Sequence, residues 1–180
     1  MNRPITPLKE TVLEIERECA KAGWSRGIVL YALVPTADVI ESAPEMAAAL
    51  ADKSPNSLTA IEQEEVELTG TIEDFLGTIS WSAEVFGAAL VLERLIVNEE
   101  PPSHLVGGSV GELAGELEGE ALASWVNEHG QEVRMVVGVL RDGSQECVMR
   151  MRAYDDENAI MAGPDLLPGM AEALALTFAE

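Results

Sequence analysis

The feature that most constrains the fold is a pair of alternating segments within residues 132–154. On each side of a short polar turn, every second residue is apolar, so each segment would place one row of apolar side chains on one face of a strand. The first row is Val133, Met135, Val137 and Val139, and the second is Cys147, Met149, Met151 and Ala153. A two-residue loop would place these rows on opposite faces of a hairpin. The three-residue loop Arg141–Gly143 places them together and puts Gly143 where a left-handed residue is needed. We therefore predict a β-hairpin that pairs Val137 with Cys147 and Met135 with Met149.

The same register gathers arginines on the other face of the hairpin. It places Arg134 opposite Arg150 with Arg152 beside them, and like charges directly opposed are unfavourable unless a negative group lies between them. Arginine suits bidentate recognition of carboxylates and phosphates better than lysine does. Two interpretations stay open: a site for an anionic ligand or an acidic partner segment, or pairing with the chain's own carboxylates. The candidate site residues are Arg94, Arg134, Arg150 and Arg152.

The first half of the chain predicts a helix and two long strands. Thr6-Pro7 is a helix start signal, apolar residues then recur at helical spacing, and Gly23 is a natural stop. Near-continuous apolar runs at 27–34 and 85–97 predict strands. In the second run Glu93 and Arg94 are neighbours, so their side chains face opposite sides of the sheet.

The other segments complete an α+β pattern for a single domain over residues 1–180. We expect a loop at 53–63, a short edge strand at 65–69 and a helix after residue 111. A last helix over 166–178 is apolar nearly all round, so it is either central to the fold or part of a subunit interface. Strands and helices do not alternate as regular βαβ units, which favours a largely antiparallel sheet with helices packed mainly on one face. The C-terminal hairpin is then followed by a buried apolar helix.

Composition and charge exclude several classes of protein. The chain has 11 basic and 32 acidic residues, so phosphate backbones and anionic lipid surfaces repel it, and we expect neither nucleic-acid nor membrane binding. No stretch approaches the roughly 18 apolar residues of a membrane span, and the N-terminus lacks the apolar run of a signal peptide. Two cysteines cannot form a disulfide framework. Cytoplasmic localisation is the expectation.

The sequence contains no recognisable catalytic or metal-binding constellation. Gly107–Gly111 has the spacing of a nucleophile elbow, but the preceding residues form a poor strand, so we expect Ser109 to cap a helix instead. The two histidines, His104 and His129, stand in polar contexts and do not make a metal site. We expect no catalytic residue, no metal and no cofactor.

Three segments resemble a known family. They are Leu30–Asp38, Ala89–Leu95, and the stretch from Gln131 to Gly169. Together they are similar to an uncharacterised family of small acidic cytosolic actinobacterial proteins, and the likeness runs from near Trp24 to the C-terminus. The resemblance implies an actinobacterial cytosolic protein and brings no activity, ligand or catalytic residue.

Two classes of function stay open. The first is a non-catalytic binding or adaptor protein, in a chaperone-like form or as a homodimer. The order of elements in the second half is like that of secretion-chaperone domains, although fold does not fix function. The alternative is a small enzyme whose carboxylate and arginine site acts on an anionic small molecule.

Overall fold

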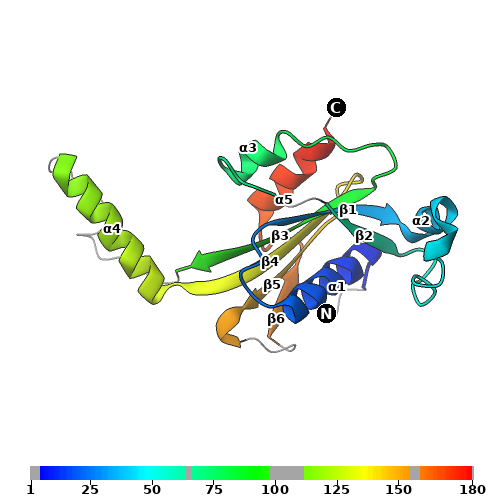
Figure 1. The fold of residues 1–180 in the computed structure, drawn as a ribbon, viewed down its shortest axis with the longest axis horizontal. Helices are drawn as coiled ribbons and strands as arrows, with labels where there is room; N and C mark the ends of the chain where they lie inside the picture. Colours follow the sequence, from blue (N-terminus) through cyan, green and yellow to red (C-terminus); the bar gives the residue numbers. More distant parts are fainter. Residues whose placement is uncertain (1–4, 64–65, 98–111, 155–158, 180) are drawn as a thin grey trace.

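The computed structural model describes residues 5–63, 66–97, 112–154 and 159–179, the side chains of 112–119 excepted (Figure 1). Its strands form a single six-stranded antiparallel sheet, ordered β2-β1-β3-β4-β5-β6. The strands are β1 (Val29–Pro35), β2 (Leu58–Glu62), β3 (Gly87–Ile96), β4 (Gln131–Leu140), β5 (Gln145–Met151) and β6 (Ile160–Gly163). The α-helices are α1 (Pro7–Ala22), α2 (Thr36–Ser42), α3 (Ile72–Leu76), α4 (Glu112–His129) and α5 (Pro168–Ala175). Short 3-10 helices lie at Pro44–Met46, Arg152–Tyr154 and Leu176–Phe178.

The predicted hairpin is confirmed as β4 and β5. Val137 pairs with Cys147, Met135 with Met149, and Arg134 with Arg150. The turn closes with the N–H of Leu140 donating to the carbonyl of Ser144 at 2.8 Å. Gly143 has a φ of +88°, the left-handed conformation that the three-residue loop requires. The α+β class, the antiparallel sheet and the helix after the hairpin are as the sequence predicts.

Helix α1 begins and ends at the predicted signals. The hydroxyl of Thr6 accepts a hydrogen bond from the N–H of Lys9 at 3.2 Å, Pro7 is the first helical residue, and Gly23 follows the last turn. Its buried side packs on one face of the sheet. The apolar cluster on that face includes Leu8, Val12, Ile15 and Cys19 of the helix and Tyr31, Leu33, Val91, Val136 and Val148 of the strands.

The opposite face of the sheet is covered by α3 and α5 (Figure 1). This cluster includes Ile72, Leu76, Ala171 and Leu174 of the helices and Leu90, Leu92, Val133, Met135, Val137 and Cys147 of the strands. The expectation that helices lie mainly on one face is therefore corrected. Because β1, β3 and β4 are apolar on both faces, each face must be covered. Helix α5 buries one side only, and Leu176 just beyond it is 66% exposed.

The edges of the sheet differ from the predicted ones. The edge strand β2 lies at Leu58–Glu62, within the expected loop; Leu58 is buried against α1, and the strand becomes more exposed toward Glu62. Strand β6 at the other edge was not predicted; its four residues are too few for a clear alternation. The elbow-like segment Gly107–Gly111 lies outside the described residues. No helix in the described parts of the chain is long and apolar enough to cross a membrane.

Helix α1 lies close to the sheet at Gly138. A Cβ at this position would come 2.6 Å from Cγ2 of Val12 and 3.0 Å from Cδ1 of Leu8. Real side chains do not tolerate the first distance, so the glycine sets how near α1 can lie to β4.

We expect Gly138→Val to lower the free energy of unfolding by about 1–3 kcal/mol, because the added atoms push α1 away from the sheet. Gly169→Ala is the matched control, since a Cβ there meets no atom within 4 Å and alanine favours a helix. Urea denaturation measures both variants. Equal stability of G138V and the wild-type chain would contradict the packing described.

Candidate functional site

The predicted arginine face carries a buried carboxylate from α1. Glu16 is fully buried and lies against Arg150, which is 2% exposed. Nε of Arg150 donates to Oε1 of Glu16 at 2.5 Å, and Nη2 donates to Oε2 at 2.8 Å. This bidentate geometry is the arrangement in which arginine and carboxylate match best. Glu16 is thus the negative group that the opposed arginines require.

Arg134 shares the same carboxylate and adds a second one. Its Nη1 lies 3.7 Å from Oε1 of Glu16, too long for a hydrogen bond, and among the described atoms this nitrogen is buried without such a bond. Its Nε and Nη2 donate to Oε1 of Glu93 at 3.3 and 3.2 Å, and Nη2 also donates to the carbonyl of Gly23 at 2.5 Å. The guanidinium lies over the ring of Trp24, 4.3 Å from its centroid. We call Glu16, Glu93, Arg134 and Arg150 the ion-pair cluster.

The other two candidate residues lie apart from this cluster. Arg152 is half-exposed at the edge of the arginine face, where it pairs with Glu132 and lies 5.7 Å from the centroid of the Trp24 ring. Arg94 is exposed and faces the other side of the sheet, because it follows Glu93 directly along β3. The structure therefore joins Arg134 and Arg150, places Arg152 beside them and leaves Arg94 outside.

Glu16 was missed by sequence reasoning, although the sequence carries a signal for it. It stands between Ile15 and Cys19 on the buried side of α1, four residues after Val12. A glutamate within an apolar helical stripe must either find a partner or disrupt the packing. The loop after α1 was also missed: the N–H of Ser25, whose φ is +68°, donates to Oε2 of Glu93 at 2.7 Å. This bond holds the loop against the cluster.

The two cysteines are buried free thiols. Burial raises the pKa of Cys19 and of Cys147 above the ordinary value. Tyr31 lies beside Cys19. Burial, together with the neighbouring Cys19 and Glu62, raises the pKa of this tyrosine. Raised pKa values keep these groups neutral, which is the opposite of an activated nucleophile. Among the described residues, no group of three or more His, Cys, Asp or Glu side chains is placed to hold a metal ion.

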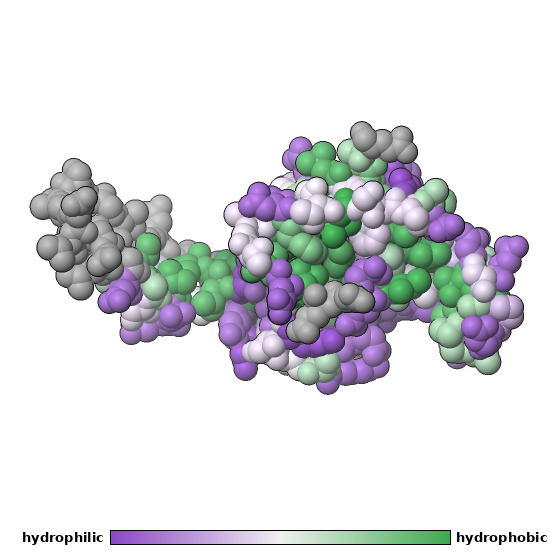
Figure 2. Space-filling model, turned by 45° about the horizontal axis from the view of Figure 1, so that its top comes forward, coloured by the Kyte–Doolittle hydropathy of each residue, from purple (hydrophilic) through white to green (hydrophobic). Residues whose placement is uncertain are grey.

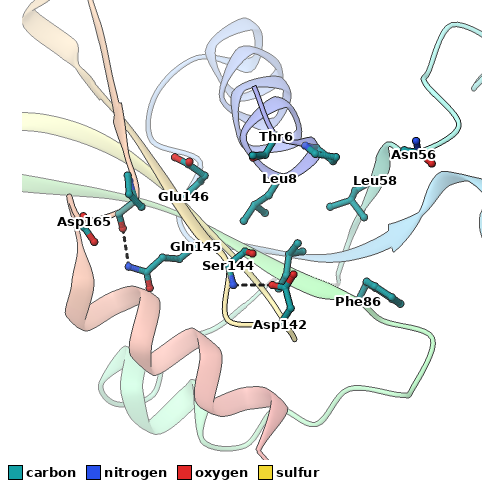
Figure 3. Close-up of a pocket in the computed structure, with 13 residues that line it drawn as sticks. Thr6, Leu8, Asn56, Leu58, Phe86, Asp142, Ser144, Gln145, Glu146 and Asp165 are labelled. Atoms are coloured by element: carbon teal, nitrogen blue, oxygen red, sulfur yellow. Dashed lines mark hydrogen bonds between the residues drawn. The ribbon is translucent and has the colours of Figure 1, made fainter. Parts of the chain in front are cut away.

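A cavity of about 580 Å³ lies where the first turn of α1 meets the β4–β5 turn. Figure 3 shows Leu8 and Leu58 on its walls, Phe86 toward one end and Glu146 and Asp165 toward the other. Carboxylates on its lining come from three separate segments: Asp142 in the turn, Glu146 in β5 and Asp165 before α5. Glu146 is 4% exposed. Hydrogen bonds from the side chain and backbone of Ser144 lower the pKa of Asp142.

Helix α4 projects from the far ends of β3 and β4, away from the other helices (Figure 1). No helix or strand within the described part of the chain packs extensively against it. Apolar side chains at the base of this arm are half-buried or exposed: Leu95, Ile96, Ala121, Leu122, Trp125 and Val126. Figure 2 shows hydrophobic residues along the neck between the arm and the rest of the molecule. The ring of Trp125 stacks on His129 with centroids 4.7 Å apart.

These features define an α+β protein with a two-sided antiparallel sheet, an internal ion-pair cluster and a projecting helix. The model of the PPA1309-like protein family matches residues 8–179, and the chain belongs to this family. The family match agrees with the resemblance to an uncharacterised family seen in the sequence. Neither the curated proteins nor the solved structures include a match to this chain.

We expect Glu16→Gln to lower the free energy of unfolding by about 3–5 kcal/mol, because it leaves Arg134 and Arg150 buried with too little negative charge. Glu18→Gln is the matched control on the same helix; that side chain is 68% exposed, and its pair with Lys21 contributes about 1 kcal/mol or less. Urea denaturation followed by circular dichroism compares the two. Similar losses in E16Q and E18Q would show that the cluster does not stabilise the fold.

Both thiols should resist alkylation by iodoacetamide in the folded protein at pH 7.5. Burial excludes the reagent, and the raised pKa values keep each thiol protonated even at a pH at which an exposed cysteine begins to ionise. Mass spectrometry should find two modified sites only after unfolding in urea. Rapid modification of the native chain would contradict the burial.

Proposed function

We propose that this protein is a non-catalytic binding or adaptor protein of the cytoplasm that holds a partner protein on α4. The observation that carries the proposal is the projecting helix, which leaves the sheet at the ends of β3 and β4 (Figure 1). It carries half-buried apolar side chains, and no helix or strand of the described chain packs extensively against it. The arginine face supports a site less well, because Arg134 and Arg150 already have carboxylate partners within the protein. This internal pairing disfavours the enzyme alternative, which needs arginines that are available to a ligand.

An isolated helix of this composition gains from a partner. Helix α4 is 18 residues long and contains Gly115 and Gly119. Each glycine costs about 1 kcal/mol relative to alanine, and helices near this length are marginal in water unless tertiary packing supports them. A partner that covers Leu122, Trp125 and Val126 would supply this packing. Tryptophan at the centre of an apolar patch is also typical of residues that dominate binding energy.

The charge of the helix indicates the chemistry of the partner. Helix α4 carries five glutamates and neither lysine nor arginine, in a chain whose net charge is −21. Two copies of this helix would repel each other, so charge complementarity favours a basic amphipathic segment over the homodimer that the apolar last helix suggested. Covering such a segment of a client protein would be a chaperone-like role, the narrower form of the proposal.

The arm can be removed without touching the sheet. Because Ile96 faces Gln131 at the end of the β3–β4 pairing, an Asn-Gly turn in place of residues 97–130 closes these strands as a hairpin. We expect both this variant and the full chain to unfold in one cooperative transition, and we expect the variant to lose the partner. A second variant, Leu122→Glu with Val126→Glu, keeps the arm and removes its apolar side. Leu176→Glu is the matched control, since Leu176 is exposed near the far end of α5.

Quantitative affinity capture from cytosol, read by mass spectrometry, decides the proposal. The supporting result is a basic protein that the wild-type chain and L176E retain and both arm variants lose. The same retained proteins for all four chains would overturn it. Sedimentation velocity adds the remaining outcome: self-association that disappears in both arm variants would show a second copy on α4 and overturn the basic partner.

A further inference from the structure

We infer that methionine side chains at the β5–β6 edge of the sheet bind a soft monovalent metal ion, Cu(I). The candidate ligands are Met149 and Met151 of β5 and Met161 of β6, which share one face of these strands. The expectation of no metal rested on histidine, cysteine and carboxylate patterns, and thioether ligands fall outside them. The arm leaves the sheet from β3 and β4, so this inference is independent of the adaptor proposal.

Methionine is concentrated on one face of the three neighbouring strands β4, β5 and β6. Met135 pairs with Met149, and Met149 pairs with Met161, so one row of thioethers crosses all three strands. The next row along the same strands faces the opposite side and contains only aliphatic residues: Val136, Val148 and Ala162. Branched aliphatic side chains are the usual choice within strands. The repeated sulfur on one face is therefore the property that needs an explanation.

Exposure rises along this row toward the edge of the sheet. Met135 is 4% exposed, Met149 is 9% exposed and Met161 is 44% exposed, while Met151 is half-buried. Hydrophobic burial accounts for the inner end of the row, but it gives no reason for a methionine at the outer end. An ion can reach the outer sulfurs from solvent while the inner methionine stays packed in the apolar cluster.

The pairing of the strands brings these side chains within reach of one ion. Met149 and Met161 are directly opposite, where Cβ atoms lie about 4.5–5.5 Å apart. Met151 is diagonal to Met161, at a distance of about 7–8 Å that long side chains span. With metal–sulfur bonds of about 2.3 Å, three sulfurs around one ion lie about 4 Å apart. The three rotatable bonds of methionine allow the sulfurs to converge to this spacing.

The chemistry of the sulfurs selects the ion. Thioethers are soft ligands that favour Cu(I) over hard cations such as Mg²⁺ and Ca²⁺. They are neutral, so three of them leave the single charge of the ion in place, and the net charge of −21 on the chain favours the approach of a cation. Cys147 lies on the same face as Met149, two residues before it, and is the competing ligand that the test must separate.

The location of the site is tested with Ag(I), a redox-inert ion with the charge and ligand preference of Cu(I), in chloride-free buffer. The full chain, labelled with ¹³C on the methionine methyl groups, gives one signal for each of its seven methionines. One equivalent of Ag(I) should shift the signals of Met149, Met151 and Met161 together. The signal of Met46 should not move, because this residue lies in the 3-10 helix Pro44–Met46.

Affinity for Cu(I) itself is measured without oxygen by competition with the chromophoric chelator bicinchoninate. Leucine matches methionine in volume and lacks sulfur, so Met149→Leu and Met161→Leu remove one ligand each and keep the packing. Each should weaken Cu(I) binding by about tenfold or more, at least the loss that changes in an outer shell produce. Met46→Leu is the matched control, since Met46 is 41% exposed, close to the 44% of Met161. Melting curves show that each variant is folded.

Each result decides the inference. Saturable binding of one Cu(I) that is weakened in M149L and M161L and retained in M46L and in Cys147→Ala would support it. Binding that is lost in C147A and kept in M161L would show a thiolate site and overturn the thioether site. Equal losses in M46L and M161L would show coordination by any exposed methionine. Absence of saturable Cu(I) binding, or Ag(I) shifts outside the three methionines, would also overturn it.

Discussion

The carboxylate of Glu16, shut off from water between two arginines, is the interaction on which the arrangement of this protein depends. It joins α1 to β4 and β5 through Arg134 and Arg150, and Arg134 in turn holds Glu93 of β3 and the carbonyl of Gly23. Four parts of the chain thus meet at charges that cannot be left unpaired. The apolar packing adds a second constraint, because Gly138 leaves room for Leu8 and Val12 of α1 at one place on β4. The charges and this packing together hold α1 in its position on the sheet.

The sheet separates two different surfaces. Strands β3 and β4 are paired over their whole length, from Gly87 and Leu140 at one end to Ile96 and Gln131 at the other. The cavity with its carboxylates lies at the first end and the acidic helix α4 at the second. Both faces of the sheet between them are covered by helices. The cavity and the projecting helix therefore lie at opposite ends of these strands rather than on the covered faces.

The hairpin could be predicted to the residue because its two constraints are local: side chains alternate with a period of two, and Gly143 suits one position of one turn. The register also showed that the opposed Arg134 and Arg150 needed a negative group. Its identity could not be predicted, since nothing local separates Glu16 from the exposed glutamates of the same helix except its place in the apolar stripe. The helices on both faces of the sheet could not be predicted either, because their positions follow from tertiary packing. The same is true of the cavity, whose walls come from segments distant in sequence.

Glu16 and Arg150 are 134 residues apart along the chain. A ribosome therefore synthesises α1, which carries the Glu16 carboxylate, long before it synthesises β5, which carries Arg150. Until then α1 cannot dock in its final position, because an unpaired charge would have to leave water. Helix α1 must therefore stay solvated while the strands that follow it are made. Docking of α1 thus depends on the synthesis of β5, which comes much later along the chain.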